Sequence, residues 1–254
     1  VCVGSGDLGD VVLFADTFNR YFEPDNLSAA IEVLTAAGFK VHQPVAADGE
    51  ARPLCCGRTY LSTGMVDKAR AEANRTIKAF KPYLQKKIPI LGLEPSCLFT
   101  FKDEFLSLID DDVAPVLAKS AMLLEEFLAG DGLQGFSRLK FQRTQGRVAW
   151  VHGHCHQKAF NSMDAVEQML QRVPDLTTKM IPSGCCGMAG AFGYQSETYD
   201  ASIGMAQLDL VPALAAVDHD DWLLADGFSC RHQISDVTGK SPRHVAQFLA
   251  RSLQ

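Results

Sequence analysis

Eight cysteines carry most of the chemistry that this sequence offers. Four of them form two adjacent pairs, Cys55-Cys56 and Cys185-Cys186, and a single cysteine follows each pair, Cys97 after 41 residues and Cys230 after 44. Adjacent residues lie about 3.8 Å apart at Cα, too close for a relaxed disulfide. In a reducing compartment, such thiols are typical of metal ligands, cluster ligands or catalytic groups.

The second half of the chain offers a complete set of four thiols. Cys155, Cys185, Cys186 and Cys230 come from three separate loops. Four thiolates match the ligand count of an iron-sulfur cluster or of tetrahedral zinc. Zinc usually draws its ligands from Cys-x₂-Cys pairs, so adjacent cysteines favour a cluster with several irons. Glycines at 184, 187, 190 and 193 allow the close backbone approach and N–H donors that a cluster needs.

The first half offers one thiol fewer. Cys55, Cys56 and Cys97 need a further ligand, which Thr17, Asp16, His42 or a residue from elsewhere could supply. The sequence leaves metal occupancy open here, with zinc as one candidate. Cys2, in the opening segment, is expected to be inert.

Histidines surround the second set of cysteines. His152, His154 and His156 alternate at the end of a predicted strand, where alternate residues share a face and Cys155 must point the other way. These histidines are therefore expected to support the ligands or the fold. His156 and His232 are the two expected to touch a cluster.

The elements that must position these residues follow the same order twice. Each half is expected to run strand, helix, strand, Cys-Cys-Gly, helix, strand, cysteine. In the first half the ranges are 11–15, 27–37, 40–43, 66–80 and 88–93, and in the second half they are 148–152, 163–173, 178–181, 197–210 and 222–225. A further helix is expected over 115–129, and the last helix is expected to start at Ser241-Pro242.

Strands that alternate with helices predict an α/β fold with parallel sheets. We expect two similar α/β halves related by a pseudo-twofold axis. The predicted domains are residues 1–130 and 147–254, joined by a linker over 131–146. The cysteines follow strand ends, where α/β sheets bind ligands, so their loops are expected to face a shared crevice.

Composition excludes several classes of protein. The 254 residues are 47% hydrophobic and 21% charged, with a net charge of −6, as in globular proteins. The sequence has no run of Lys and Arg residues, which argues against a nucleic-acid partner. Its apolar stretches are all shorter than a membrane span requires. No signal peptide is visible, which predicts a cytoplasmic location. The chain opens at Val1, in a segment without an expected regular structure, so we expect that a longer polypeptide precedes it.

The twin Cys-Cys-Gly blocks, each followed by a cysteine at a strand end, resemble the cysteine-rich CCG domain. This domain occurs in heterodisulfide reductase B subunits, glycolate oxidase iron-sulfur subunits, lactate-utilisation proteins and the anaerobic glycerol-3-phosphate dehydrogenase C subunit. Segments 16–24, 52–58, 93–97 and 152–159 resemble more closely the C-terminal part of fused FAD-linked oxidases. Those enzymes act on substrates of the D-lactate, glycolate or D-2-hydroxyglutarate type.

The sequence departs from the pattern of that family, which is a cysteine, a Cys-Cys pair and Cys-x-x-Cys in each half. Cys155 matches the first position in the second half, and Thr17 stands there in the first. One cysteine of each Cys-x-x-Cys is missing, and the residues in its place are Glu94 or Thr100 in the first half and Gly227 or Gln233 in the second. Relatives with the full pattern can hold a noncubane [4Fe-4S] cluster in each half. The resemblance therefore implies a cluster in the second half, with four of five ligands, and leaves the first half in doubt.

The resemblance implies an iron-sulfur electron-transfer module of a flavin-dependent 2-hydroxy acid dehydrogenase. FAD would lie on a separate domain or subunit, and the cluster would pass electrons to an acceptor. The chain alone is expected to be inert towards the hydroxy acid. Its expected location is cytoplasmic, with attachment to the inner face of the membrane only through partners. Two alternatives stay open: a thiol redox centre like that of heterodisulfide reductase, and a zinc-binding structural or docking domain.

Overall fold

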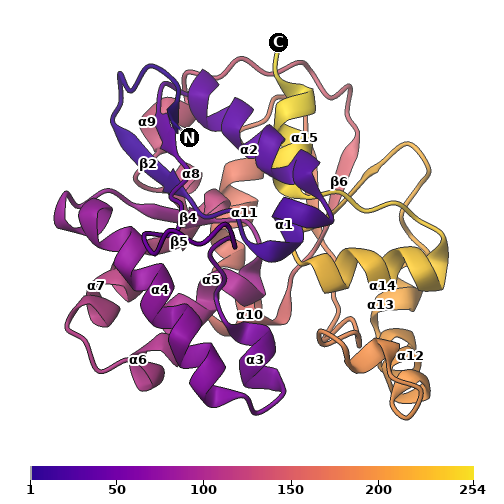
Figure 1. Cartoon of the computed structure of the whole chain (residues 1–254). Helices are drawn as coiled ribbons and strands as arrows, with labels where there is room; N and C mark the ends of the chain where they lie inside the picture. Colours follow the sequence, from indigo (N-terminus) through magenta and orange to yellow (C-terminus); the bar gives the residue numbers. More distant parts are fainter. Residues whose placement is uncertain (1) are drawn as a thin grey trace. The chain divides into compact units, whose positions relative to one another are not determined.

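The computed structural model describes residues 2–254, and Val1 lies outside the described residues (Figure 1). The chain forms two compact units, Val1–Leu139 and Lys140–Gln254. The division falls inside the predicted linker, shortly after the short helix α9 (Leu133–Phe136). The pseudo-twofold axis, the shared crevice and the predicted domain limits stay predictions, so each unit is described by itself.

The first unit is built on a five-stranded sheet in the order β1-β3-β2-β4-β5. The strands are β1 (Cys2–Val3), β2 (Asp10–Leu13), β3 (Lys40–His42), β4 (Ile90–Gly92) and β5 (Ala121–Leu123). All neighbours are parallel except β1, which pairs antiparallel with β3. The expectation of a parallel sheet therefore needs a correction at this edge, where the opening segment contributes a strand.

One predicted helix of the first unit, over 115–129, was wrong. The chain instead forms α7 (Val113–Ser120), β5 and α8 (Leu124–Ala129). Ala121 and Leu123 are fully buried, and β5 pairs with β4 along its whole length. Pairing at a sheet edge thus overrides the local helical pattern, which a single sequence does not reveal.

Helices α2 (Pro24–Ala36) and α4 (Val66–Gln85) match predicted helices with shifted ends. Ala69, Ala73 and Phe80 lie on one face of α4 and are buried, as the helical period requires. Phe80, Phe14 and Phe101 pack edge to face, with ring centroids 5.1 to 5.8 Å apart. This aromatic cluster holds α4 and α5 (Pro95–Lys102) beside the sheet. The remaining helices of the unit are α1 (Thr17–Tyr21), α3 (Arg58–Ser62) and α6 (Glu104–Leu108).

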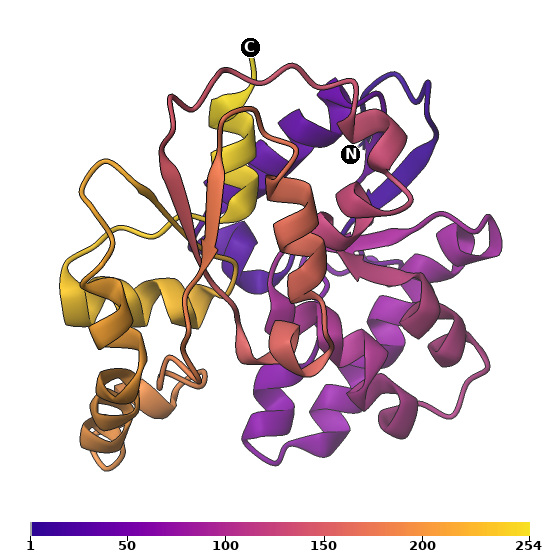
Figure 2. The ribbon, with the colours of Figure 1, turned by 180° about the vertical axis from the view of Figure 1, so that it is seen from behind.

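The second unit has a parallel three-stranded sheet in the order β7-β6-β8 (Figure 2). Its strands are β6 (Val148–His152), β7 (Thr177–Met180) and β8 (Trp222–Ala225). Its helices are α10 (Cys155–Ala159), α11 (Met163–Leu170), α12 (Tyr199–Leu208), α13 (Leu210–Leu214), α14 (Phe228–Thr238) and α15 (Val245–Ser252), with a 3₁₀ turn η1 (Phe192–Tyr194). The helix predicted over 197–210 is thus divided into α12 and α13, around Asp209.

The predicted start of the last helix was also wrong. Helix α15 begins at Val245, and the His244 side chain caps it by accepting a hydrogen bond from Ala246 N at 3.0 Å. Arg243 runs beside β8, donating its N–H to Leu223 O at 2.9 Å and accepting from Ala225 N at 3.0 Å. The segment after Pro242 therefore extends the sheet before the helix can start.

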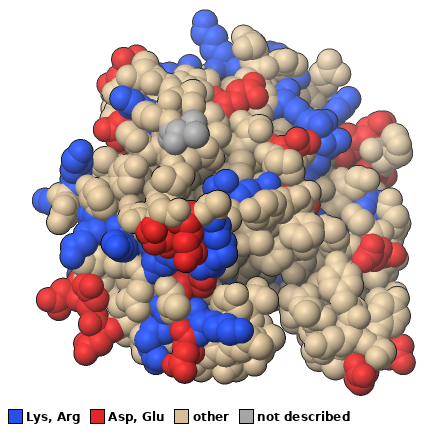
Figure 3. Space-filling model, viewed as in Figure 1, with Lys and Arg blue, Asp and Glu red and all other residues tan. Residues whose placement is uncertain are grey.

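The surface carries acidic and basic side chains interspersed over one face, while few charges lie over α12 and α14 (Figure 3). Tyr194, Tyr199 and Leu208 are among the exposed apolar side chains of that unit. Within residues 2–254, the helices are all too short or too polar to cross a membrane.

Candidate metal centre

Cys155 is held at the end of the central strand of the second unit. It is the first residue of α10, three residues after the last residue of β6. The His154 side chain caps this helix by accepting from His156 N at 3.1 Å, and the His154 N–H donates to Gln157 Oε1 at 3.0 Å. Reciprocal capping fixes the start of the helix, which leaves the Cys155 side chain exposed at the carboxyl edge of the sheet.

Cys185 and Cys186 sit in a tight turn after β7 that only glycine can complete. Gly187 has φ of 92°, and a Cβ there would lie 2.2 Å from Ser202 O. The Gly187 N–H donates to Cys185 Sγ at 3.3 Å. Lys158 connects this turn to α10, the helix that begins at Cys155, because its Nζ donates a hydrogen bond to Gly184 O at 2.8 Å.

Cys230 is the third residue of α14, which begins just after β8 ends. It is buried, and so is Cys186, whereas Cys155 and Cys185 retain access to solvent. All four predicted cysteines thus follow the carboxyl ends of β6, β7 and β8.

Distances show that these side chains converge. Cys155 Sγ lies 3.8 Å from Cys185 Sγ. A ring nitrogen of His152 and the sulfurs of Cys186 and Cys230 lie within 4.8 Å of one another, and all three residues are buried. Sulfur and nitrogen atoms at this separation can share a metal or a cluster.

Hydrogen bonds among the four thiols of the second unit distribute their protons unequally, and two of the sulfurs are held as thiolates, the form that binds metal. Hydrogen bonds from Cys155 and then Cys186 lower the pKa of Cys185 to about 2. A hydrogen bond from Cys186 holds the pKa of Cys230 well below its usual range, with His154 and His152 adding to the effect against burial. The pKa values of the proton donors Cys155 and Cys186 rise correspondingly, first through their hydrogen bonds to Cys185.

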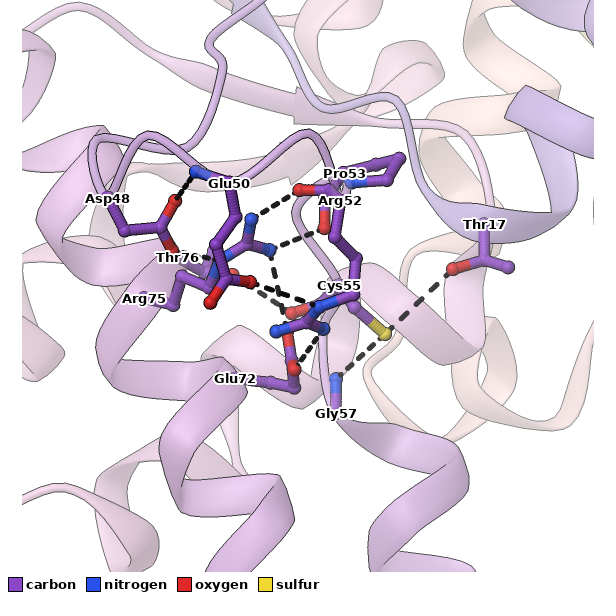
Figure 4. Close-up of polar contacts among 10 residues, drawn as sticks. All are labelled: Thr17, Asp48, Glu50, Arg52, Pro53, Cys55, Gly57, Glu72, Arg75 and Thr76. Carbon is purple, nitrogen blue, oxygen red and sulfur yellow. Dashed lines mark hydrogen bonds and ion pairs between the residues drawn. The ribbon is translucent and has the colours of Figure 1, made fainter.

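The first unit repeats this arrangement with one exchange. Thr17 is the first residue of α1, as Cys155 is of α10, and Thr17 Oγ1 donates to Cys55 Sγ at 3.8 Å (Figure 4). The Gly57 N–H donates to Cys55 Sγ at 3.4 Å, and Gly57 has φ of 79°. Cys97 is the third residue of α5, the position of Cys230 in α14. The hydroxyl of Thr17 therefore occupies the place of the fourth thiol.

The loop that carries Cys55 is anchored to α4 by charged side chains (Figure 4). Arg75 donates to Pro53 O at 2.5 Å and pairs with Asp48. Arg52 pairs with the buried Glu72, and Thr76 Oγ1 donates to Cys55 O at 2.9 Å. The first cysteine pair is thus positioned independently of any metal.

Acidic side chains dominate the surroundings of the first set. Asp16 caps α1 and Glu94 caps α5, and both are buried. Burial, together with the charge of Glu94, raises the pKa of Asp16 to about 6. A hydrogen bond from Cys56 lowers the pKa of Cys97, but burial and both carboxylates outweigh it and raise that pKa to about 12. Hydrogen bonding to Cys56 and burial raise the pKa of Cys55 as well.

The candidate His42 is engaged elsewhere, since its Nε2 lies 3.1 Å from Asp10 Oδ1 and its ring packs on Tyr83. Within residues 2–254, only the His152, Cys186 and Cys230 group brings three such ligand atoms within 4.8 Å.

The histidines of the second unit lie differently from the expected alternation. The strand ends at His152, so His154 and His156 belong to the start of α10, where their rings stack with centroids 5.1 Å apart. His232 packs on Phe228, with ring centroids 4.1 Å apart. His152 is the histidine whose ring lies beside the sulfurs of Cys186 and Cys230. Its predicted place at the end of a strand was the one feature of the sequence that could have indicated this role.

A comparison with known protein families identifies the family of this chain. The model of the cysteine-rich CCG domain matches residues 14–102 and 149–235, one match for each cysteine set. The chain belongs to the CCG family. The first match runs from just after β2 to the end of α5, and the second from β6 to most of α14, so the family expectation from the twin Cys-Cys-Gly blocks is confirmed.

Curated relatives of this CCG chain include two dehydrogenase proteins and a lactate utilization protein. It is 24% identical to D-2-hydroxyglutarate dehydrogenase of Pantoea ananatis, over 94% of the chain but 22% of that protein. It is 25% identical to the C subunit of the anaerobic glycerol-3-phosphate dehydrogenase of Escherichia coli K12, over 96% of the chain and 59% of that protein. It is 24% identical to lactate utilization protein A of Macrococcus caseolyticus, over 87% of the chain and 85% of that protein. The chain thus spans about a fifth to three fifths of the first two relatives.

Proposed function

We propose that this chain is the iron-sulfur electron-transfer module of a flavin-dependent 2-hydroxy acid dehydrogenase. The observation that carries the proposal is the convergence of Cys155, Cys185, Cys186 and Cys230 at one sheet edge. Relatives named as dehydrogenases of 2-hydroxyglutarate and glycerol-3-phosphate support a redox role beside a substrate-oxidising domain.

The residues of the second repeat fit a [4Fe-4S] cluster. Cys186 and Cys230 are buried, Gly187 brings a backbone N–H to Cys185 Sγ, and the tight turn leaves no room for a Cβ at Gly187. Such burial and N–H donation to sulfur stabilise a cluster and tune its potential. A bound cluster would supply one-electron transfer, and the exposed Cys155 marks the side from which electrons can enter or leave.

The first repeat suits an anionic cluster less well. Three thiols with raised pKa values stand beside the buried carboxylates of Asp16 and Glu94, and Thr17 replaces the fourth thiol. Carboxylate and thiolate together are ligands that zinc accepts. We therefore assign the cluster to the second repeat and propose that the first repeat either serves as scaffold or binds zinc.

The partners follow from this assignment. FAD and the hydroxy acid would bind to a separate domain or subunit, since this chain aligns with only 22% of the D-2-hydroxyglutarate dehydrogenase that it resembles. An electron acceptor would then meet the cluster side. We propose a cytoplasmic location, with contact to the inner face of the membrane only through partners.

The test is anaerobic purification of the chain, with measurement of visible absorbance, iron and sulfide. A brown protein with about four irons and four sulfides per chain supports the proposal. A colourless protein that contains zinc contradicts it and favours a structural zinc domain. Cys2→Ser, which changes an exposed cysteine outside both repeats, is the matched control and should keep all its iron.

A further inference from the structure

We propose that His152 is a ligand of the metal centre in the second repeat, through Nε2, in place of the fifth cysteine that the CCG pattern would supply. This inference rests on the proposed function and adds a nitrogen ligand to the four cysteines.

His152 lies at the end of β6, beside two of the cysteines. His152 is the last residue of β6 and is 1% exposed. Its ring nitrogen lies within 4.8 Å of the sulfurs of Cys186 and Cys230, which are themselves within 4.8 Å of each other. An atom bound by all three is thus within reach after small side-chain adjustments.

The two ring nitrogens of His152 differ in their hydrogen bonding. Nδ1 lies 2.9 Å from the Ser183 hydroxyl, which fixes the orientation of the ring. Nε2 is buried and has no hydrogen-bond partner. Metal-bound histidines typically hold their second nitrogen in this way, while an unpaired buried nitrogen is otherwise unfavourable. Binding to a metal through Nε2 would satisfy that atom.

Gly227 stands where the family pattern has its fifth cysteine, and little space surrounds it. Gly227 precedes Cys230 by three residues, as the first cysteine of Cys-x-x-Cys would. A Cβ at Gly227 would lie 2.3 Å from Cδ2 of His154 and 3.3 Å from Cys230 Sγ. The His154 ring therefore fills the space that a cysteine side chain would need, and the fifth ligand has to come from another direction.

The first repeat supplies an internal comparison. His152 lies three residues before Cys155, and Phe14 lies three residues before Thr17. Phe14 packs in the aromatic cluster with Phe80 and Phe101 and offers no ligand atom. The imidazole is thus present only in the repeat that has four thiols.

A neutral imidazole in place of a thiolate makes a cluster less negative by one charge, which raises its reduction potential. His152→Cys should therefore retain the cluster and lower its potential. His152→Phe, which copies the first repeat, should lose at least half of the bound iron.

The test is pulsed electron paramagnetic resonance on the anaerobic holoprotein, prepared with ¹⁵N-labelled histidine and brought to a paramagnetic state by one-electron reduction or oxidation. A strong nitrogen coupling that takes the ¹⁵N pattern in the wild type and disappears in His152→Cys is the expected result. His232→Phe and His156→Phe are matched controls, in which the coupling should persist.

Two results would overturn the inference while leaving the proposed function intact. One is a holoprotein with full iron and sulfide but no histidine coupling, and the other is a coupling that disappears in His156→Phe or His232→Phe and survives in His152→Cys. A protein that binds no iron would overturn both proposals. Circular dichroism of each variant shows whether a lost cluster reflects a lost ligand or a lost fold.

Discussion

In the second repeat, the side chain at the start of the helix after the central strand is the Cys155 thiol, 3.8 Å from Cys185 Sγ. In the first repeat, the same position holds the Thr17 hydroxyl, also 3.8 Å from the sulfur of its partner, Cys55. The backbone frame that presents ligands is therefore shared, down to the glycine N–H that reaches the first cysteine of each pair. The two repeats thus present different ligand atoms, a hydroxyl and a thiol, on the same backbone arrangement.

The neighbours of the sulfurs differ in charge as well. At the helix caps, the first repeat has Asp16 and Glu94, where the second has His154 and Gly227. Against a hydrogen bond from Cys56, burial and the two carboxylates raise the pKa of Cys97. A hydrogen bond from Cys186, with the imidazole of His154 adding to it, lowers the pKa of Cys230. The carboxylates thus oppose negative charge on sulfur in the first repeat, whereas the His154 imidazole supports it on Cys185 and Cys230 of the second, and this difference in charge is one reason why we place an anionic cluster there.

The largest expected difference between the repeats is in bound iron. Cys186→Ser should remove almost all iron and sulfide, while Cys56→Ser, the equivalent change in the first repeat, should remove little. Both variants should stay folded, because a chain of this size buries a core that needs no metal. Iron analysis with circular dichroism makes the comparison, and equal iron loss in the two variants would show that both repeats hold clusters.

A gain of binding sharpens the same comparison. Thr17→Cys in a Cys185→Ser, Cys186→Ser background should give the first repeat four thiols while the second keeps only two. Titration with Co²⁺ should then produce a thiolate charge-transfer band several times stronger than in the Cys185→Ser, Cys186→Ser background alone. An unchanged band would mean that Asp16 and Glu94, not the missing thiol, prevent metal binding.

The Cys-Cys-Gly turns should differ in their tolerance of a methyl group. Gly187→Ala places a Cβ 2.2 Å from Ser202 O and should destabilise its unit by about 4 kcal/mol. Gly57→Ala meets Ala69 O at 3.0 Å and should cost about 2 kcal/mol. Thermal unfolding of the two metal-free variants measures both values. A larger loss for Gly57→Ala would contradict the geometry of these turns.

The last expected effect concerns pH. Asp16 has a pKa raised to about 6 in the folded protein, so between pH of about 4 and about 6 the folded state keeps a proton that the unfolded chain has lost. Stability should therefore fall by about 2–3 kcal/mol as pH rises through this window. Asp16→Asn should remove this part of the pH dependence in urea unfolding. An identical pH dependence in wild type and variant would show that Asp16 is ionised throughout.

The sequence predicted those features that depend on local pattern and spacing. The paired cysteines, the trailing Cys97 and Cys230 and the order of strands and helices were visible in the chain itself, and the family match confirms the two repeats. The strand β5 and the start of α15 were not predictable, because each depends on pairing with a distant strand.

The histidines show a different limit. Alternation along a strand was the basis for judging His152, His154 and His156 together, but β6 ends at His152 and a helix starts at Cys155. Strand ends are the least predictable part of a sequence pattern. A displacement of a few residues was enough to separate His152, beside Cys186 and Cys230, from the other two.

The central claim is that this chain carries electrons away from a flavin and takes no part in oxidising the hydroxy acid. Stopped-flow spectroscopy of the complete enzyme with its flavin domain tests the claim directly, with Cys186→Ser compared to wild type. We expect that the hydroxy acid reduces the flavin of the variant at the normal rate and that the downstream acceptor reoxidises it slowly. Loss of flavin reduction itself, in a folded and flavin-replete variant, would contradict the account.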